Sequence, residues 1–304
     1  MRNEPSTSFP HRRESPKKGH LSTQRIVLLV VAVLLSTPSF AQEETNYTWQ
    51  TFRDTRIVNG HSVESGQQGE MKMIISHRFG ALNSGAYELY GLDQATIRYG
   101  LDYAITNNLD VGVGRSSFQK TFDGYVKYKF RSQSSGARNM PISATFLQGF
   151  SWYGLKWQNP EFPFPLTNRL TYFSQLIVAR KFSPKFSLQV SPTYVHRNYV
   201  ANRQITNDLA FVGISSRVQV TKVTAVLMEF FPKVYGTLAT GRGSSFSLGA
   251  EFQTKAHVFQ LHLSNSSGMV ESLFLTETTG SWSDLGIMIG FNITRDFKVG
   301  KRRF

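Results

Sequence analysis

The 304-residue chain contains no cysteine, so disulfides and thiolate metal sites are excluded. Charged residues are scarce at 18%, whereas hydrophobic residues make up 40% and aromatic residues 13%. This composition is too apolar for a disordered chain. No uncharged apolar run approaches the roughly 20 residues that a membrane-spanning helix needs. The composition therefore predicts one sizeable folded domain without transmembrane helices.

Between residues 70 and 294 the chain repeatedly alternates apolar and polar residues, with aromatics prominent among the apolar ones. In the clearest run, residues 94–104, the apolar positions are Ala95, Ile97, Tyr99, Leu101 and Tyr103. Successive side chains of a strand point to opposite sides, so such a run has one apolar and one polar face. This pattern is typical of a transmembrane β-barrel, in which every second side chain meets lipid.

Twelve strands are expected, centred on residues 70–79, 94–104, 109–116, 121–131, 141–152, 169–181, 185–197, 207–220, 222–231, 244–253, 255–264 and 284–295. Tight turns such as Ser183-Pro184-Lys185 alternate with longer connections, although 132–140 is long for a turn. We therefore predict an all-β fold, a transmembrane antiparallel barrel of about 12 strands with up-and-down topology. Its turns and both termini would be periplasmic and its loops extracellular.

Residues 1–41 have the layout of a secretory signal peptide. Basic residues precede an apolar run at 26–35, and Ser39-Phe40-Ala41 fits the small-x-small cleavage pattern, so the mature chain is expected to begin at Gln42. A retained anchor is the alternative, but the run is short for a spanning helix. Residues 42–69 have no clear strand pattern. They are either a periplasmic extension or a plug folded into a barrel formed by residues 70–304.

The formal net charge is +14, and residues 1–41 hold six basic and two acidic residues, which leaves about +10 for the mature chain. Basic residues alternate with apolar positions instead of forming one patch, which argues against nucleic acid as a partner. Outer-membrane lipid headgroups, or a basic lumen that favours anions, are the expected uses of this charge. The terminal Phe304 is a weak mark of chains handled by the outer-membrane assembly machinery, a second expected partner.

A soluble β-sandwich is the main alternative fold, because its strands also alternate. Two observations favour the barrel. The polar faces carry full charges, such as Lys127 and Lys129 opposite Val126 and Tyr128. Aromatics also tend to lie at strand ends, where the interfacial girdles of a membrane barrel belong.

Several charged residues fall on predicted polar faces, namely Arg78, Arg98, Asp102, Lys127, Lys129 and Arg131. Charges inside a barrel can pair across neighbouring strands, and leaving one unpaired costs far more than a surface pair contributes. We interpret the set as a lumen network that fixes strand register; the alternative is a selectivity ring for a small solute. Arg115 falls on the apolar side, where it would snorkel at an interface or lie beyond the strand end.

No catalytic, cofactor or metal site is predicted. Gly112-Val113-Gly114 lacks the Lys-Ser/Thr of a phosphate loop and reads as glycines in a twisted or bulged strand. The histidines offer no pair at helical metal-ligand spacing. A lipid hydrolase on the barrel wall would have to use His196, His257 or His262 with Ser191, Ser264 or Ser266, oriented by Asn198 or Asn265. No nucleophile motif surrounds these serines.

Four segments are unusually rich in polar residues: Asn59-Gly60-His61-Ser62-Val63-Glu64, Ile75-Ser76-His77-Arg78-Phe79-Gly80, residues 90–103 with Asp93 and Arg98, and Gly112-Val113-Gly114-Arg115-Ser116. In these segments the chain resembles an uncharacterised family of exported β-barrel proteins, a likeness that covers most of the mature chain. The resemblance carries a family-like motif of His61, Ser62, His77, Arg78, Asp93 and Arg98. It implies a barrel in the outer membrane of a Gram-negative envelope and no particular reaction.

The expected function is therefore non-enzymatic, as a small channel or a plugged transport accessory. The alternatives are an anchoring envelope protein and the lipid hydrolase described above. A barrel this narrow is often occluded by its own side chains, and Tyr125 and Lys127 are expected to point inward.

Overall fold

The structure is a computed structural model that describes residues 44–157, 164–254 and 257–299; the predicted signal peptide lies outside these ranges. Twelve strands make up the wall: β2 (Glu70–Ala81), β3 (Ala95–Ala104), β4 (Leu109–Ser116), β5 (Phe122–Arg131), β7 (Ser143–Trp152), β8 (Leu170–Ser183), β9 (Phe186–Arg197), β10 (Asp208–Gln219), β11 (Thr224–Phe231), β13 (Ser245–Gln253), β14 (His257–Ser264) and β15 (Met288–Lys298). These bounds differ from the predicted ones by at most a few residues.

The sheet closes on itself. Each wall strand pairs antiparallel with its neighbours in chain order, and β15 pairs with β2 to complete the circle. The prediction of a 12-stranded antiparallel barrel with up-and-down topology is confirmed. Closure leaves no unpaired edge, which is the condition for a sheet to exist in hydrocarbon.

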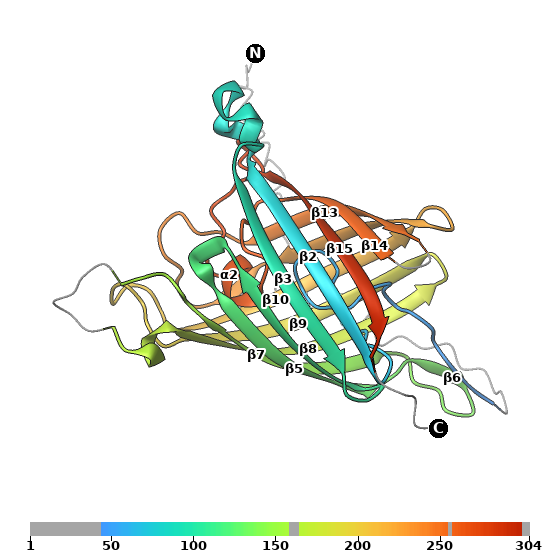
Figure 1. The fold of residues 1–304 in the computed structure, drawn as a ribbon. Helices are drawn as coiled ribbons and strands as arrows, with labels where there is room; N and C mark the ends of the chain where they lie inside the picture. The colour runs from blue at the N-terminus through green and yellow to red at the C-terminus, as the bar shows by residue number, and fades with distance from the viewer. Residues whose placement is uncertain (1–43, 158–163, 255–256, 300–304) are drawn as a thin grey trace, which may run out of the picture.

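The two ends of the barrel differ. One end carries tight turns, the start of β2 and the end of β15; the other carries the longer connections, including the one that projects from β2 and β3 at the top of Figure 1. The connection between β5 and β7 is long because it contains β6 (Ser134–Gly136), which pairs with β1 (Thr45–Tyr47). The smaller elements are β12 (Lys233–Tyr235), the 3₁₀ turns η1 (Leu82–Ser84), η2 (Ala86–Gly91), η3 (Phe118–Lys120) and η4 (Leu166–Arg169), and the helix α2 (Glu271–Phe274).

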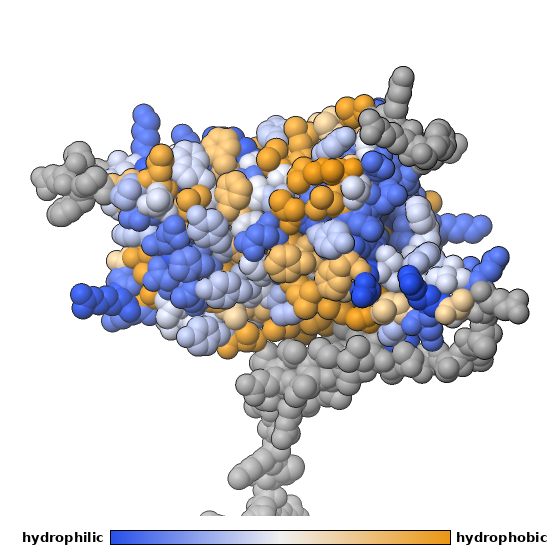
Figure 2. Space-filling view, turned by 90° about the horizontal axis from the view of Figure 1, so that it is seen from below, coloured by the Kyte–Doolittle hydropathy of each residue, from blue (hydrophilic) through white to orange (hydrophobic). Residues whose placement is uncertain are grey.

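The alternation seen in the sequence becomes an inside and an outside. On β3, Tyr99 and Leu101 are 56% and 46% exposed, whereas Arg98 and Asp102, which flank them, are buried. Figure 2 shows hydrophobic side chains gathered over the middle of one face of the wall, with hydrophilic ones toward both ends. No helix among the described residues is long and apolar enough to cross a membrane.

The interior is lined unevenly by apolar and polar side chains. Large buried apolar side chains gather on β7 to β11, among them Leu147, Phe173, Ile177, Val195, Leu209, Phe211 and Leu227, beside buried polar ones such as Gln175, Thr193 and Glu229. Most of the buried charged and histidine side chains of the wall lie on β13 to β5, among them Glu251, His262, Arg78, Arg98, Asp102, Asp123 and Lys127. The interior is therefore a partly apolar core rather than a uniformly wet pore.

We expect Leu261→Arg to destabilise the barrel in a lipid bilayer by about 2–4 kcal/mol, because this outward side chain lies midway along β14 and is 54% exposed. The matched control is Val223→Arg, which is as exposed but lies in the turn between β10 and β11, where the expected cost is about 0–1 kcal/mol. Reversible unfolding in urea from lipid vesicles measures both. Equal costs at the two positions would mean that the outer face does not meet hydrocarbon.

Candidate functional site

The segment that precedes the barrel folds into its lumen. Residues 51–64, here called the N-terminal insert, enter the barrel and turn back as a tight hairpin. In this hairpin the backbones of Arg56 and His61 form an antiparallel β-bridge, and the Ile57 amide donates to the Gly60 carbonyl over 2.9 Å. Ile57, Val58 and Val63 are at most 3% exposed and belong to the apolar core. Of the two alternatives for residues 42–69, this burial favours the plug.

The tip of this hairpin is held by one carboxylate. The backbone amides of Val58, Asn59 and Gly60 all donate to the oxygens of Glu229, over 2.9, 2.8 and 3.0 Å. Consecutive amides of a turn form a concave anion site, and here the wall supplies the anion. A Cβ on Gly60 would lie 2.8 Å from the buried Phe231 ring, so a larger residue in this turn would have to displace that ring.

Side chains from other strands complete the grip on the hairpin tip. Asn59 accepts from Arg78 of β2 and donates to Ser247 of β13 over 3.0 Å. Asn292 of β15 donates to the Val58 carbonyl over 2.8 Å. The insert is thus fixed to widely separated parts of the wall.

Charged pairs secure the base of the insert. Asp54 accepts from Lys72 over 2.5 Å and from Thr294 over 2.6 Å, and Glu64 lies 3.2 Å from Lys129. Burial alone would raise the pKa of Asp54, but the charge of Lys72 and the hydrogen bonds outweigh it and lower that pKa. The Lys127 ammonium donates to the Glu64 carbonyl.

A second segment enters the lumen from the opposite end. Residues 265–287, here called the loop insert, connect β14 to β15 and contain α2, whose four residues are all buried. The Phe274 ring packs edge-on against Phe231 of β11 at 4.9 Å between centroids, and the Ser272 hydroxyl hydrogen-bonds that of Ser151 on β7.

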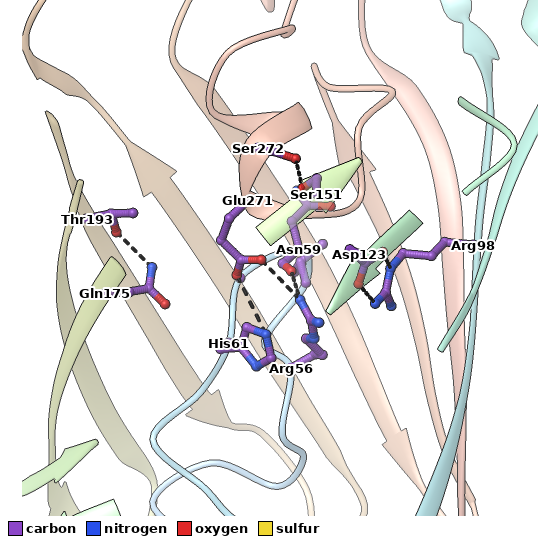
Figure 3. Close-up of polar contacts among 12 residues, drawn as sticks. Arg56, Asn59, His61, Arg98, Asp123, Ser151, Gln175, Thr193, Glu271 and Ser272 are labelled. Atoms are coloured by element: carbon purple, nitrogen blue, oxygen red, sulfur yellow. Dashed lines mark hydrogen bonds and ion pairs between the residues drawn. The ribbon is translucent and has the colours of Figure 1, made fainter. Parts of the chain in front are cut away.

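The two inserts meet inside the barrel. Glu271 of α2 lies 3.6 Å from Arg56 Nη1 and 3.9 Å from His61 Nε2, and all three side chains are almost fully buried (Figure 3). We call these three residues the latch. Burial raises the pKa of Glu271 against the opposing charge of Arg56, and burial together with nearby cations lowers the pKa of His61 well below its usual range.

A vestibule lies on either side of the inserts. The turn-side vestibule has a volume of about 770 Å³, and its charged lining residues are Asp54, Glu64, Glu70, Asp102, Asp110 and Asp296 against Arg53, Lys72 and Lys129. The loop-side vestibule has a volume of about 350 Å³, and its charged lining residues are Arg169, Arg197 and Arg242 against Glu277. The turn-side vestibule is therefore acidic and the loop-side vestibule basic.

Most residues of the predicted lumen network lie on the inner face of the wall. Arg98 donates to both carboxylate oxygens of Asp123, Lys127 and Lys129 contact the N-terminal insert, and Asp102 is buried near the same cluster. Arg131 differs: it is exposed, beside a break in register between β5 and β7, and it donates to the Phe130 carbonyl. Arg115 faces outward, with its guanidinium 5.0 Å from the Phe122 ring.

The residues of the family-like motif do not gather at one place. His61 belongs to the latch, and Ser62 donates to the Asp54 carbonyl and so supports the hairpin. His77 faces outward and stacks on Phe291 at 4.9 Å. Asp93 is exposed in the connection between β2 and β3.

The glycines of β4 have a packing reason. Neither pairing of β4 shows a register shift. A Cβ on Gly112 would lie 2.3 Å from the Tyr125 ring, and one on Gly114 would lie 2.3 Å from an Arg98 nitrogen. These glycines leave room for large inward side chains, so the bulge is not needed to explain them.

Two of the three histidines considered for hydrolysis lie on the opposite side of the wall from the serines. His196, which lies 2.7 Å from Asp208, and His257 face outward, whereas Ser191 and Ser264 are buried inside. The remaining candidates, His262 and Ser266, are buried as well, and Asn265 bonds to backbone groups of the loops. No hydrogen bond joins a serine to a histidine, and no group of His, Asp and Glu suits a metal ion, within the ranges that the structure describes.

Three residues of the site escape sequence reasoning. Glu229 and Glu271 were not singled out, and Asn59 was noted only for its motif. A signal existed for the first, because Glu229 is an acid on the inner side of an otherwise apolar strand between Leu227 and Phe231. Asn59-Gly60 is a standard tight-turn pair. Nothing in the local sequence around Glu271 indicates that it meets Arg56.

Comparison with known proteins places the chain in a family. Residues 52–297 match the family described as membrane bound beta barrel domain (DUF5777). The chain belongs to this family. The predicted resemblance to an uncharacterised family of barrel proteins is confirmed. The match begins inside the N-terminal insert and ends in β15, so the family pattern includes both inserts.

Solved structures with a similar fold are distant in sequence, and no curated protein matches. They include the NanC porin (7% identity, TM-score 0.46, 75% of this chain and 99% of that one) and the COG4313 outer membrane channel from Pseudomonas putida F1 (12%, 0.45, 77% and 98%). The Acinetobacter baumannii outer membrane protein Omp33 is a third (11%, 0.40, 77% and 100%).

We expect Glu229→Ala to lower stability by about 3–5 kcal/mol, because it leaves three buried amides without an acceptor and Arg78 without a nearby carboxylate. The insert should also become accessible to protease at residues 51–64. Urea unfolding in detergent and limited proteolysis measure the two effects. The control is Glu88→Ala, which removes a half-buried acid of η2 whose carboxylate accepts from Gln94; a loss as small as the control's would show that Glu229 does not hold the insert.

Proposed function

We propose that the protein is a non-enzymatic channel of the Gram-negative outer membrane, closed at rest by its two inserts. The observation that carries this proposal is the latch, in which segments entering from opposite ends of the barrel meet through Arg56, His61 and Glu271. The turn end, with the start and end of the barrel, is assigned to the periplasm and the loop end to the exterior.

The way the lumen is filled supports a channel over a plain anchor. An anchor needs only a filled interior, as small barrels achieve with wall side chains. Here vestibules of about 770 and 350 Å³ lie on either side of two separate segments. Displacing either segment would therefore join spaces that already exist, without opening the wall.

The latch geometry supports a contact that can release. The 3.6 and 3.9 Å separations of Glu271 from Arg56 and His61 are ion-pair distances, longer than a direct hydrogen bond. The raised pKa of Glu271 and the lowered pKa of His61 both report that burial disfavours their charged forms. The latch contact therefore depends on the protonation states of Glu271 and His61. The tip of the N-terminal insert, by contrast, is held by several short hydrogen bonds.

We expect Glu271→Lys to raise the open probability in planar bilayers at least tenfold, because it places a second buried cation beside Arg56 in place of its partner. The double variant Arg56→Glu with Glu271→Lys should return toward wild type, since it restores a pair of opposite charges. Glu88→Lys is the control for the change of charge alone. Identical, silent traces for wild type and Glu271→Lys would remove the channel and leave the anchor.

A disulfide tether tests whether the loop insert moves. The chain has no cysteine, and the hydroxyls of Ser151 and Ser272 already touch, so Ser151→Cys with Ser272→Cys introduces a single pair at contact distance. Added to Glu271→Lys, the oxidised pair should abolish the extra openings and reduction should restore them. Openings that ignore the redox state would mean that α2 does not move during gating.

We also expect acidification to favour opening through His61. Its pKa is low when closed and near 6.5 when released, so the proton binds the released state preferentially, and closure weakens as pH falls through 6.5. A single titrating group can change the ratio of open to closed protein by at most about tenfold per pH unit. Glu271 acts oppositely, because its raised pKa makes the closed state the better proton binder toward pH 4.5. His61→Gln should abolish the rise in open probability between pH 7.5 and 5.5; an unchanged pH profile in that variant would contradict the assignment.

A further inference from the structure

The loop-side vestibule is built from the inner face of the wall and from the loops above it. Its sides come from the ends of β7, β8 and β9, and its floor comes from α2 and the residues after it, including Ser272, Leu273 and Thr276. The volume of about 350 Å³ is at the small end of the range for sites that bind small molecules.

The charges of this vestibule are biased to one sign. Arg169, Arg197 and Arg242 line it against Glu277 alone among acidic residues of the described lining. Arg242 lies 2.9 Å from Glu277, and Arg169 is held by the carbonyls of Tyr153 and Leu155.

Arg197 stands out among the three arginines. It points inward from the end of β9, and its Nη2 donates to the Thr206 carbonyl over 2.6 Å, which fixes the side chain. Its Nε is buried and has no hydrogen-bond partner. A buried donor of a charged group without an acceptor is costly, so this atom has capacity for a bound anion.

Three aromatic side chains lie together beside the arginines. Trp157 stacks on Phe164 at 4.2 Å with the rings 10° apart, and Tyr199 packs edge-on against Phe164 at 4.8 Å. Trp157 and Tyr199 nevertheless remain 40% and 42% exposed. The guanidinium of Arg169 lies 5.4 Å from the Phe164 ring, which joins the cationic and aromatic parts of the lining.

We propose that the loop-side vestibule is a binding site for a small organic anion that carries a ring. A carboxylate would be held by Arg197 and its neighbouring arginines through charge-assisted hydrogen bonds, and the ring would lie against Trp157 and Tyr199. The volume fits a single ring rather than a polymer. The acidic turn-side vestibule lacks this chemistry, so the site belongs to the loop end only.

Equilibrium dialysis of the full mature protein in detergent separates charge from ring. Glucuronate supplies both, glucose the ring alone and succinate the charge alone. We expect glucuronate to bind about tenfold or more tightly than either of the others, the factor that one charge-assisted hydrogen bond gives. Benzoate in place of glucuronate distinguishes an aromatic from a sugar ring.

Variants assign the binding to the named residues. Arg197→Gln and Trp157→Ala should each weaken glucuronate binding about tenfold, whereas Arg197→Lys, which keeps the charge, should lose less. Arg203→Gln is the matched control, because Arg203 is an exposed arginine of the connection after β9 and does not line the vestibule. Each variant is first shown to be folded by its heat-dependent shift in gel migration.

Three outcomes overturn the proposal: equal binding of glucose and the anions, equal binding of succinate and the ring anions, or glucuronate binding that is absent or unchanged in Arg197→Gln. The proposal adds a ligand to the proposed channel but does not need the channel to open. Binding without conductance would leave this site standing and refute the channel, and conductance without binding would do the reverse.

Discussion

The width of a closed 12-stranded sheet is the constraint on which the rest of the structure depends. Hydrocarbon offers no partner for backbone amides and carbonyls, so the sheet must close, and here it does so through the pairing of β15 with β2. A barrel of about eight strands can be filled by its own side chains, whereas a wider one leaves space inside. Two inserted segments occupy part of that space, and the interior takes its character from how they are held.

Filling a lumen from both ends explains why its lining combines apolar and polar side chains. Apolar residues of the inserts, such as Ile57 and Phe274, need apolar neighbours, and β8 to β11 supply them. The backbone of the N-terminal insert needs hydrogen-bond partners, and inward polar side chains supply these, above all the Glu229 carboxylate. The inner face of the barrel therefore serves as both a core and a set of clamps.

The sequence predicts the wall well and the lumen poorly, for physical reasons. Strand bounds and inward parity follow from a period of two, which is why Arg98 and Lys127 could be assigned to the inner face. Counting alternate residues fails for Arg131. The register of β5 against β7 shifts between Lys129 and Arg131, so the side chain of Arg131 is exposed instead of lying inside. Contacts across the lumen have no period. Glu229 meets Val58 171 positions away, and nothing local in either segment encodes the pairing.

The contacts of Glu229 with the N-terminal insert differ in kind from the contacts of Glu271 in the latch. Glu229 accepts three backbone amides within 3.0 Å, and its removal leaves those donors buried without an acceptor. Glu271 lies farther from its side-chain partners, at 3.6 Å from Arg56 and 3.9 Å from His61, and the attraction of Arg56 there opposes the cost of burying the carboxylate. A segment held by the first kind of contact is fixed, and a contact of the second kind can change with small shifts of charge. The boundary between the vestibules therefore lies where the two inserts meet through ion-pair distances of 3.6 and 3.9 Å, and the proposed opening would begin at this contact and leave the wall unchanged.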